Sequence, residues 1–160
     1  MSFFKNKNLS AVQVNERNQF FTPGLYLVKL KGVDIIKNAK QTVKIVGEIF
    51  AVKNQEDGPA VGESAAQIFS TAGSPKDEEL GIKNLMQFVT SIFKCDPEDK
   101  TREEWESIIE SIVDDHDLDG EFLMLECFEI TTQKGNPFTI HTWGGLATDD
   151  DFTKFGITRP

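Results

Sequence analysis

The sequence has 160 residues, a formal net charge of −9 and 39% hydrophobic residues. A chain of this length forms one domain with a buried core and needs neither disulfides nor a metal ion for stability. It contains no apolar run near the ~20 residues of a membrane-spanning helix and no signal-peptide pattern at its start, and Cys95 and Cys127 have neither a CxxC motif nor a His at ligand spacing. We therefore expect a soluble, cytoplasmic protein that contacts no membrane and holds no metal ion or other cofactor.

Charge is distributed unevenly along the chain. Residues 1–55 carry nine basic and three acidic side chains, whereas residues 56–160 carry eight basic and twenty-three acidic ones. The basic part is also rich in Val and Ile, so its lysines fall within predicted strands. This pattern predicts a localised surface that binds a polyanion on an otherwise acidic protein. Lysines that protect an exposed strand edge from pairing would give the same pattern.

The chain is predicted to consist of three parts. Residues 1–21 are polar and rich in Asn, with a Phe pair at either end, and we expect an arm that docks through these aromatics. A turn signal, Thr22-Pro23-Gly24, opens a domain over residues 22–146. The tail, residues 147–160, contains three consecutive Asp and two Phe, and we expect it to be loosely ordered.

The domain begins with three predicted strands. Alternating apolar residues over 25–36 and a second Val- and Ile-rich run over 42–53 predict a hairpin whose first strand has a wet basic face. Gly32 and Gly47 interrupt these runs and predict a bulge or a sharp bend. A shorter run over 64–70 predicts the third strand.

Two helices are predicted next. Ser74 and Pro75, followed by acidic residues, are typical of a helix start, and apolar residues then recur at helical spacing until Asp96. Thr101 and Glu104 form a capping-box pattern before a second apolar stripe, which predicts another helix.

The last elements complete a recognisable order. A dense apolar run over 121–132 predicts a strand buried on both faces, and alternation over 138–143 predicts a final strand. We therefore predict a mainly β protein, a five-stranded OB-fold-like barrel with one or two helices between strands three and four. OB-folds bind oligonucleotides with the loops that join strands one to two and four to five. Here these loops are residues 37–41 and 133–137, and both contain Lys and Asn.

The pattern of glycines and apolar residues resembles phage-encoded OB-fold proteins that bind single-stranded DNA. The segments that carry the resemblance are FTPGLYLV at 21–28, VKIVGEIF at 43–50, Val61-Gly62 before Ile68-Phe69, LGIKNL at 80–85 and LDGEF at 118–122. The resemblance covers about residues 21–145. It implies non-catalytic, sequence-independent binding of single-stranded DNA during phage replication or recombination, in the cytoplasm of the host cell. Replication or recombination proteins are further expected partners, and self-association into a homo-oligomer is also open.

Sequence-tolerant binding of a single strand requires cations along the phosphates and flat side chains on which bases stack, at about 1–3 kcal/mol per base. The predicted phosphate contacts are Lys29, Lys31, Lys37, Lys40, Lys44 and Lys134. The predicted base contacts are Phe50, Phe69, His141 and Trp143. For each aromatic residue, packing in the core is the alternative, because large aromatics mostly supply core area.

Other functions remain open at this point. The run Asp114-Asp115-His116-Asp117 could be drawn as a catalytic or metal cluster, but no nucleophile elbow, P-loop or HExxH motif accompanies it, so we predict no enzyme. Twelve acidic residues between Asp96 and Glu121 are the solvated face of a helix, or a surface that repels DNA or docks a basic protein. The alternative function is a phage structural or protein-interaction module that binds no nucleic acid; an acidic mimic of DNA would leave the basic part unexplained.

Overall fold

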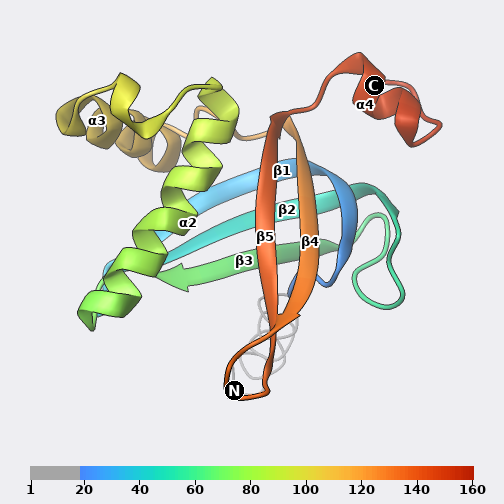
Figure 1. Cartoon of the computed structure of the whole chain (residues 1–160). Helices are drawn as coiled ribbons and strands as arrows, with labels where there is room; N and C mark the ends of the chain where they lie inside the picture. The colour runs from blue at the N-terminus through green and yellow to red at the C-terminus, as the bar shows by residue number, and fades with distance from the viewer. Residues whose placement is uncertain (1–18) are drawn as a thin grey trace, which may run out of the picture.

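The structure of the protein is a computed structural model that describes residues 19–160. Its elements confirm the predicted order of three strands, helices and a closing hairpin (Figure 1). They are β1 (Gly24–Ile36), β2 (Thr42–Lys53), β3 (Ser64–Ser70), α2 (Pro75–Phe93), a 3-10 turn (Pro97–Asp99), α3 (Arg102–Asp114), β4 (Phe122–Thr131), β5 (Pro137–Leu146) and α4 (Asp149–Lys154). No helix within residues 19–160 has the length and apolar character needed to cross a membrane.

The five strands form one curled antiparallel sheet in the order β3-β2-β1-β4-β5. Within the described residues no backbone ladder joins β3 to β5, so the sheet is barrel-like but open between these two edges. One side-chain hydrogen bond bridges the opening, in which Trp143 Nε1–H donates to Gln67 Oε1 at 2.8 Å. Because each neighbouring pair is antiparallel, β3 and β5 run in the same direction.

Two irregularities bend the first hairpin. The register between β1 and β2 shifts between Leu30 and Gly32, opposite Gly47 and Val46, which confirms the bulge that the glycines predicted. Lys31 is the extra residue at this shift. A second shift lies between Leu27 and Val28, where Phe50 is the extra residue on β2. Such bulges increase the twist of a strand and help a flat sheet to curl.

One face of the sheet and two helices enclose the main core (Figure 1). Helix α2 begins as predicted, because the Asp77 N–H donates to Ser74 Oγ at 3.2 Å. Helix α3 begins with the predicted capping box of Thr101 and Glu104. The largest fully buried side chains of this core include Tyr26, Val28, Leu30, Val33, Val43, Ile45, Ile49, Phe88, Leu123 and Leu125. We call the opposite side of the sheet the outer face.

The prediction that the fourth strand is buried on both faces is wrong for its second half. β1 pairs with β4 only as far as Cys127, so the end of β4 and the start of β5 extend beyond the sheet as a two-stranded arm. Phe128, Ile130 and Phe138 on this arm are 44%, 40% and 46% exposed. The apolar pattern of β4 alone does not indicate where its pairing with β1 ends.

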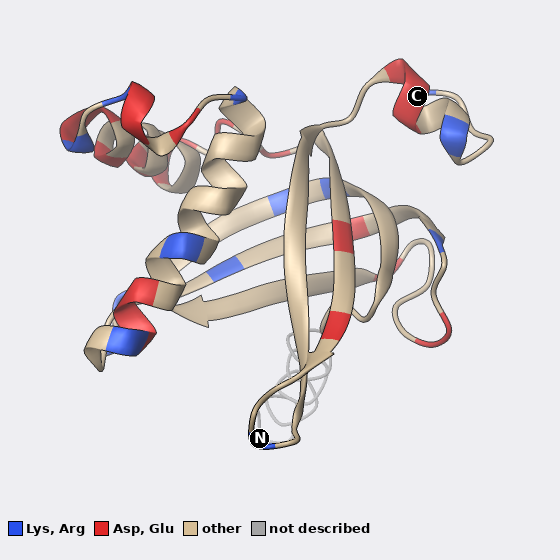
Figure 2. Cartoon of the chain, viewed as in Figure 1, with Lys and Arg blue, Asp and Glu red and all other residues tan. Residues whose placement is uncertain are grey.

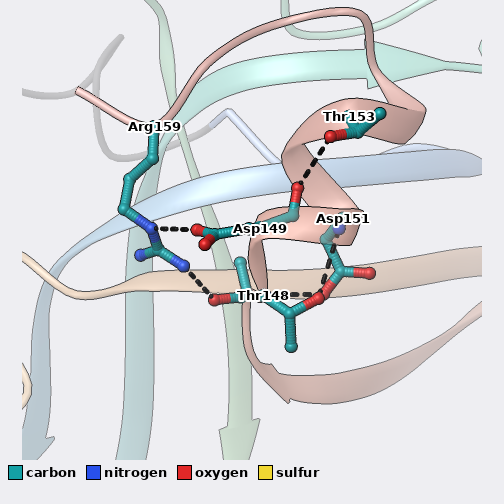
Figure 3. Close-up of polar contacts among 6 residues, drawn as sticks. Thr148, Asp149, Asp151, Thr153 and Arg159 are labelled. Carbon is teal, nitrogen blue, oxygen red and sulfur yellow. Dashed lines mark hydrogen bonds and ion pairs between the residues drawn. The ribbon is translucent and has the colours of Figure 1, made fainter.

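The prediction of a loosely ordered tail is also wrong. The tail forms α4 and packs Phe152, which is 1% exposed, against a second apolar cluster on the outer face, whose members include Leu27, Phe50, Phe122, Met124, Phe155 and Ile157. Arg159 fixes the end of the tail, because its guanidinium donates to Asp149 Oδ1 at 2.9 Å and to the Ala147 carbonyl at 2.8 Å (Figure 3). The tail is ordered because these outward apolar side chains of β1, β2 and β4 need a cover.

Most of the predicted N-terminal arm, residues 1–18, lies outside the described residues. Of the Phe pair at its end, Phe21 docks through its ring, whereas Phe20 contacts β3 through its backbone and its ring is 52% exposed. Phe20 forms a parallel bridge with Ala66 on β3. Phe21 is 3% exposed and packs edge-to-face on Tyr26, with ring centroids 5.3 Å apart.

Candidate nucleic-acid interface

A groove of about 670 Å³ lies on the outer face of β1, β2 and β3. Lys31 and Lys44 line it. Gly32, Gly62 and Ala66 are small lining residues, so bound groups can approach the backbone closely. We call this depression the outer groove.

The register of the first hairpin determines the charge of this surface. Lys44 lies opposite Asp34, and Lys29 lies opposite Glu48. The outer groove therefore has mixed charge, since Asp34 and Glu63 also line it. However, among the described residues no carboxylate lies within ion-pair distance, 4.0 Å, of Lys31 or Lys44. Their ammonium groups are available to an anionic ligand.

The β1–β2 loop adds two exposed lysines at the end of the same hairpin, Lys37 and Lys40. The backbone of this loop is fixed, because the Lys40 carbonyl accepts hydrogen bonds from the N–H groups of Thr71 and Ala72 at 3.2 and 2.9 Å. Five of the six predicted lysines therefore lie on one hairpin. The sixth, Lys134, lies in the loop of the β4–β5 arm, beyond the part of β4 that pairs with β1. Figure 2 shows basic residues on β1 and β2, whereas acidic residues concentrate on α3.

The structure corrects the prediction that Trp143 stacks on bases. Its side chain is 2% exposed and packs edge-to-face on Phe88, with ring centroids 5.1 Å apart. β5 turns this residue into the core because α2 covers its inner face, where the Gln87 side chain bonds both the N–H and the carbonyl of Trp143. A base cannot reach the indole ring.

The prediction that Phe50 contacts a base is also wrong. It lies on the outer face as expected, but its ring packs on Phe122 and Phe152, with centroids 4.9 and 6.1 Å away. The half-buried position results from the ordered tail, which covers this end of the sheet.

Phe69 and His141 do not lie on the outer groove. Both are half-buried and line a second groove, of about 600 Å³, between β3 and β5. Burial lowers the pKa of His141 to about 4, so its imidazole is neutral at pH 7. The predicted base contacts are therefore split between the core, the tail cluster and this second groove.

An aromatic residue that the sequence reasoning did not assign to binding lies beside the outer groove. Phe20 is 52% exposed at the edge of β3, where its neighbour Gln19 and its bridge partner Ala66 both line the groove. The adjacent Phe21 is buried. Successive residues of an extended segment point to opposite sides, so a Phe pair in such a segment indicates one inward and one outward ring.

Within residues 19–160, no three His, Cys, Asp or Glu side chains come close enough together to hold a metal ion. In the acidic run before β4, His116 Nδ1 lies 3.4 Å from Asp119 Oδ2, and both side chains are exposed. What the outer groove offers is cations, a small-residue lining and one exposed aromatic ring.

Comparison of the sequence with models of protein families gives no match, and comparison with curated proteins gives no significant match.

Proposed function

We propose that this protein binds single-stranded DNA without sequence specificity, as a non-catalytic component of phage-type DNA replication or recombination. The observation that supports this proposal best is the outer groove, in which Lys31 and Lys44 have no ion-pair partner among the described residues and Phe20 lies exposed at the rim. Phosphates contact these lysines and those of the β1–β2 loop. A base stacks on Phe20.

A single strand suits this surface better than a duplex. Stacking on Phe20 requires a base whose face is free, and the bases of a duplex are stacked on one another. The two carboxylates that line the groove, Asp34 and Glu63, also limit the density of phosphates that it can hold. We therefore expect moderate affinity that decreases with salt, because each neutralised phosphate contributes about 0.7 to the slope of log K against log salt on a single strand.

The test is a fluorescence anisotropy titration of labelled oligo-dT, oligo-U and a matched duplex at about 50 and 300 mM salt. The variant Lys31→Gln with Lys44→Gln removes two cations of the groove and should weaken binding of oligo-dT roughly tenfold at the lower salt, with a slope lower by about 1.4. The matched control is Lys76→Gln with Lys83→Gln, two exposed lysines of α2. Equal losses in both double variants, or equal affinity for duplex and single strand, would contradict the proposal.

Stacking is tested separately. Phe20→Ala should weaken binding about fivefold or more, since one stacked base contributes about 1–3 kcal/mol. Phe128→Ala is the control, because Phe128 is 44% exposed but lies on the β4–β5 arm. If both variants bind oligo-dT like the wild type, Phe20 contacts no base.

A further inference from the structure

The second groove lies in the opening of the barrel. It takes four consecutive residues from each of the two edge strands, 67–70 of β3 and 138–141 of β5. Leu80, Gly81 and Asn84 of α2 also line it. Part of each of two strand edges therefore borders one groove, and we call it the edge groove.

The hydrogen-bond pattern shows which backbone groups face the edge groove. The Ala66 N–H donates to the Gln19 carbonyl at 3.1 Å, away from β2, so alternation along β3 directs Ile68 and Ser70 to the same side. On β5, the N–H and carbonyl of Trp143 bond to Gln87, away from β4. Because the direction of the backbone groups alternates along a strand, the N–H and carbonyl groups of Thr139 and His141 also point away from β4.

These edges lack strand partners. Within residues 19–160, Ile68, Ser70, Thr139 and His141 make no backbone hydrogen bond on the groove side. The Ser70 carbonyl lies against Gly81 of α2, and the Thr139 carbonyl accepts from the His141 side chain, so the four N–H groups and the carbonyls of Ile68 and His141 are the groups open to a partner. A row of unpaired N–H and carbonyl groups at a strand edge is a template for pairing with another strand. Here two such rows face one groove.

The direction of the edges allows one strand to use both. Because β3 and β5 run in the same direction, a strand inserted between them is parallel to both or antiparallel to both. The chain itself begins such an insertion, since Phe20 pairs with Ala66 in parallel before the chain turns away at Thr22. The edge of β3 thus already accepts a strand next to the edge groove.

The lining favours a polypeptide over a nucleic acid. It is mainly apolar, with Phe69, Leu80 and Phe138 among its side chains, and Asp77 is its one charged residue among those that the structure describes. His141 is neutral at pH 7 because burial lowers its pKa to about 4. Residues 19–160 therefore offer a polyanion no cation in this groove, whereas the apolar side chains of an extended peptide would be buried there.

We propose that the edge groove binds an extended peptide segment of a partner protein by strand addition between β3 and β5. The segment carries apolar residues at alternate positions, because successive side chains of a strand point to opposite faces, and a basic residue near Asp77. This site is separate from the outer groove and does not depend on the proposed binding of DNA.

In the experiment, the full-length protein is the target for selection from a displayed library of random linear peptides. The affinity of the selected peptides is then measured by fluorescence anisotropy. Alternating apolar residues are expected among them. N-methylation at one set of alternate residues removes the donors to β3, and N-methylation at the other set removes the donors to β5, so each change should weaken binding at least tenfold. Burial of apolar side chains alone would not depend on the backbone N–H groups, and unchanged affinity after N-methylation of both sets would overturn the proposal.

Two protein variants complete the test. Ser70→Pro removes an N–H that faces the groove without removing a hydrogen bond to β2, and Phe138→Glu places a charge in the lining. Each variant should weaken peptide binding at least tenfold. Phe128→Glu, on the same arm but outside the groove, is the control. Lys31→Gln with Lys44→Gln should leave the peptide affinity unchanged, and Ser70→Pro should leave oligo-dT binding unchanged. Displacement of the peptide by oligo-dT, or self-association of the chain that Phe138→Glu abolishes, would show a different occupant and overturn the proposal.

Discussion

Replacing Phe152 by Ala tests whether the C-terminal segment is part of the folded domain. The Phe152 side chain is 1% exposed, and its ring lies 5.3 Å from that of Phe122 and 6.1 Å from that of Phe50. Burial of a whole Phe side chain contributes about 1.5–3 kcal/mol, and each aromatic pair adds about 0.5–1.5 kcal/mol. The sum agrees with the usual cost of Phe→Ala in a core, about 3–5 kcal/mol. We expect a loss of about 3 kcal/mol in the free energy of unfolding.

The assay is denaturant unfolding followed by circular dichroism, with amide hydrogen exchange at Phe155 and Ile157 as a local probe. Phe128→Ala is the matched control, because the same substitution at a ring that is 44% exposed should cost about 0.5 kcal/mol or less. Protection of the tail amides should decrease in Phe152→Ala and not in the control. A difference of less than about 1 kcal/mol between the two variants would refute the view that the tail is an integral cover of the outer face.

Two further changes test the interior. Gln67→Leu removes the acceptor of the 2.8 Å hydrogen bond from Trp143 Nε1–H. Because the indole N–H stays buried, the free energy of unfolding in denaturant titrations should decrease by about 1–3 kcal/mol. An unchanged unfolding midpoint would mean that water replaces Gln67. His141 has a pKa of about 4 in the folded state because of burial, below the ordinary 6.5, so the unfolded state binds more protons between these values. Stability should therefore rise with pH across this range, and His141→Phe should flatten that slope in titrations at several pH values; an equal slope in both proteins would contradict the assignment.

The sequence was sufficient for the local elements. Helix starts depend on nearby residues, so Ser74 and the pair Thr101 and Glu104 predicted both correctly. The bulge in β1 is likewise local, because Gly32 and Gly47 interrupt two runs that alternate on either side. Periodicity also predicted the order of strands and helices, since the spacing of apolar residues reflects which face of an element is buried.

The candidate site could be predicted only in part. The lysines of the first hairpin lie together because they are close in sequence and their strand is exposed on one face. The accessibility of the aromatics depends on distant neighbours: Trp143 is buried because α2 covers it and Phe88 of that helix packs on its ring. Phe20 is accessible because Phe21 takes the inward position.

Composition, periodicity and capping signals thus determined a five-stranded, mainly β domain with two helices after the third strand and a lysine-bearing first hairpin. Only the tertiary structure decided that the tail folds back. Strand register brings Leu27, Phe122 and other outward apolar side chains together, and the tail covers the cluster that they form. The tertiary structure alone also decided that β3 and β5 remain apart, since the closure of a barrel depends on the accumulated twist of all its strands and not on any one segment.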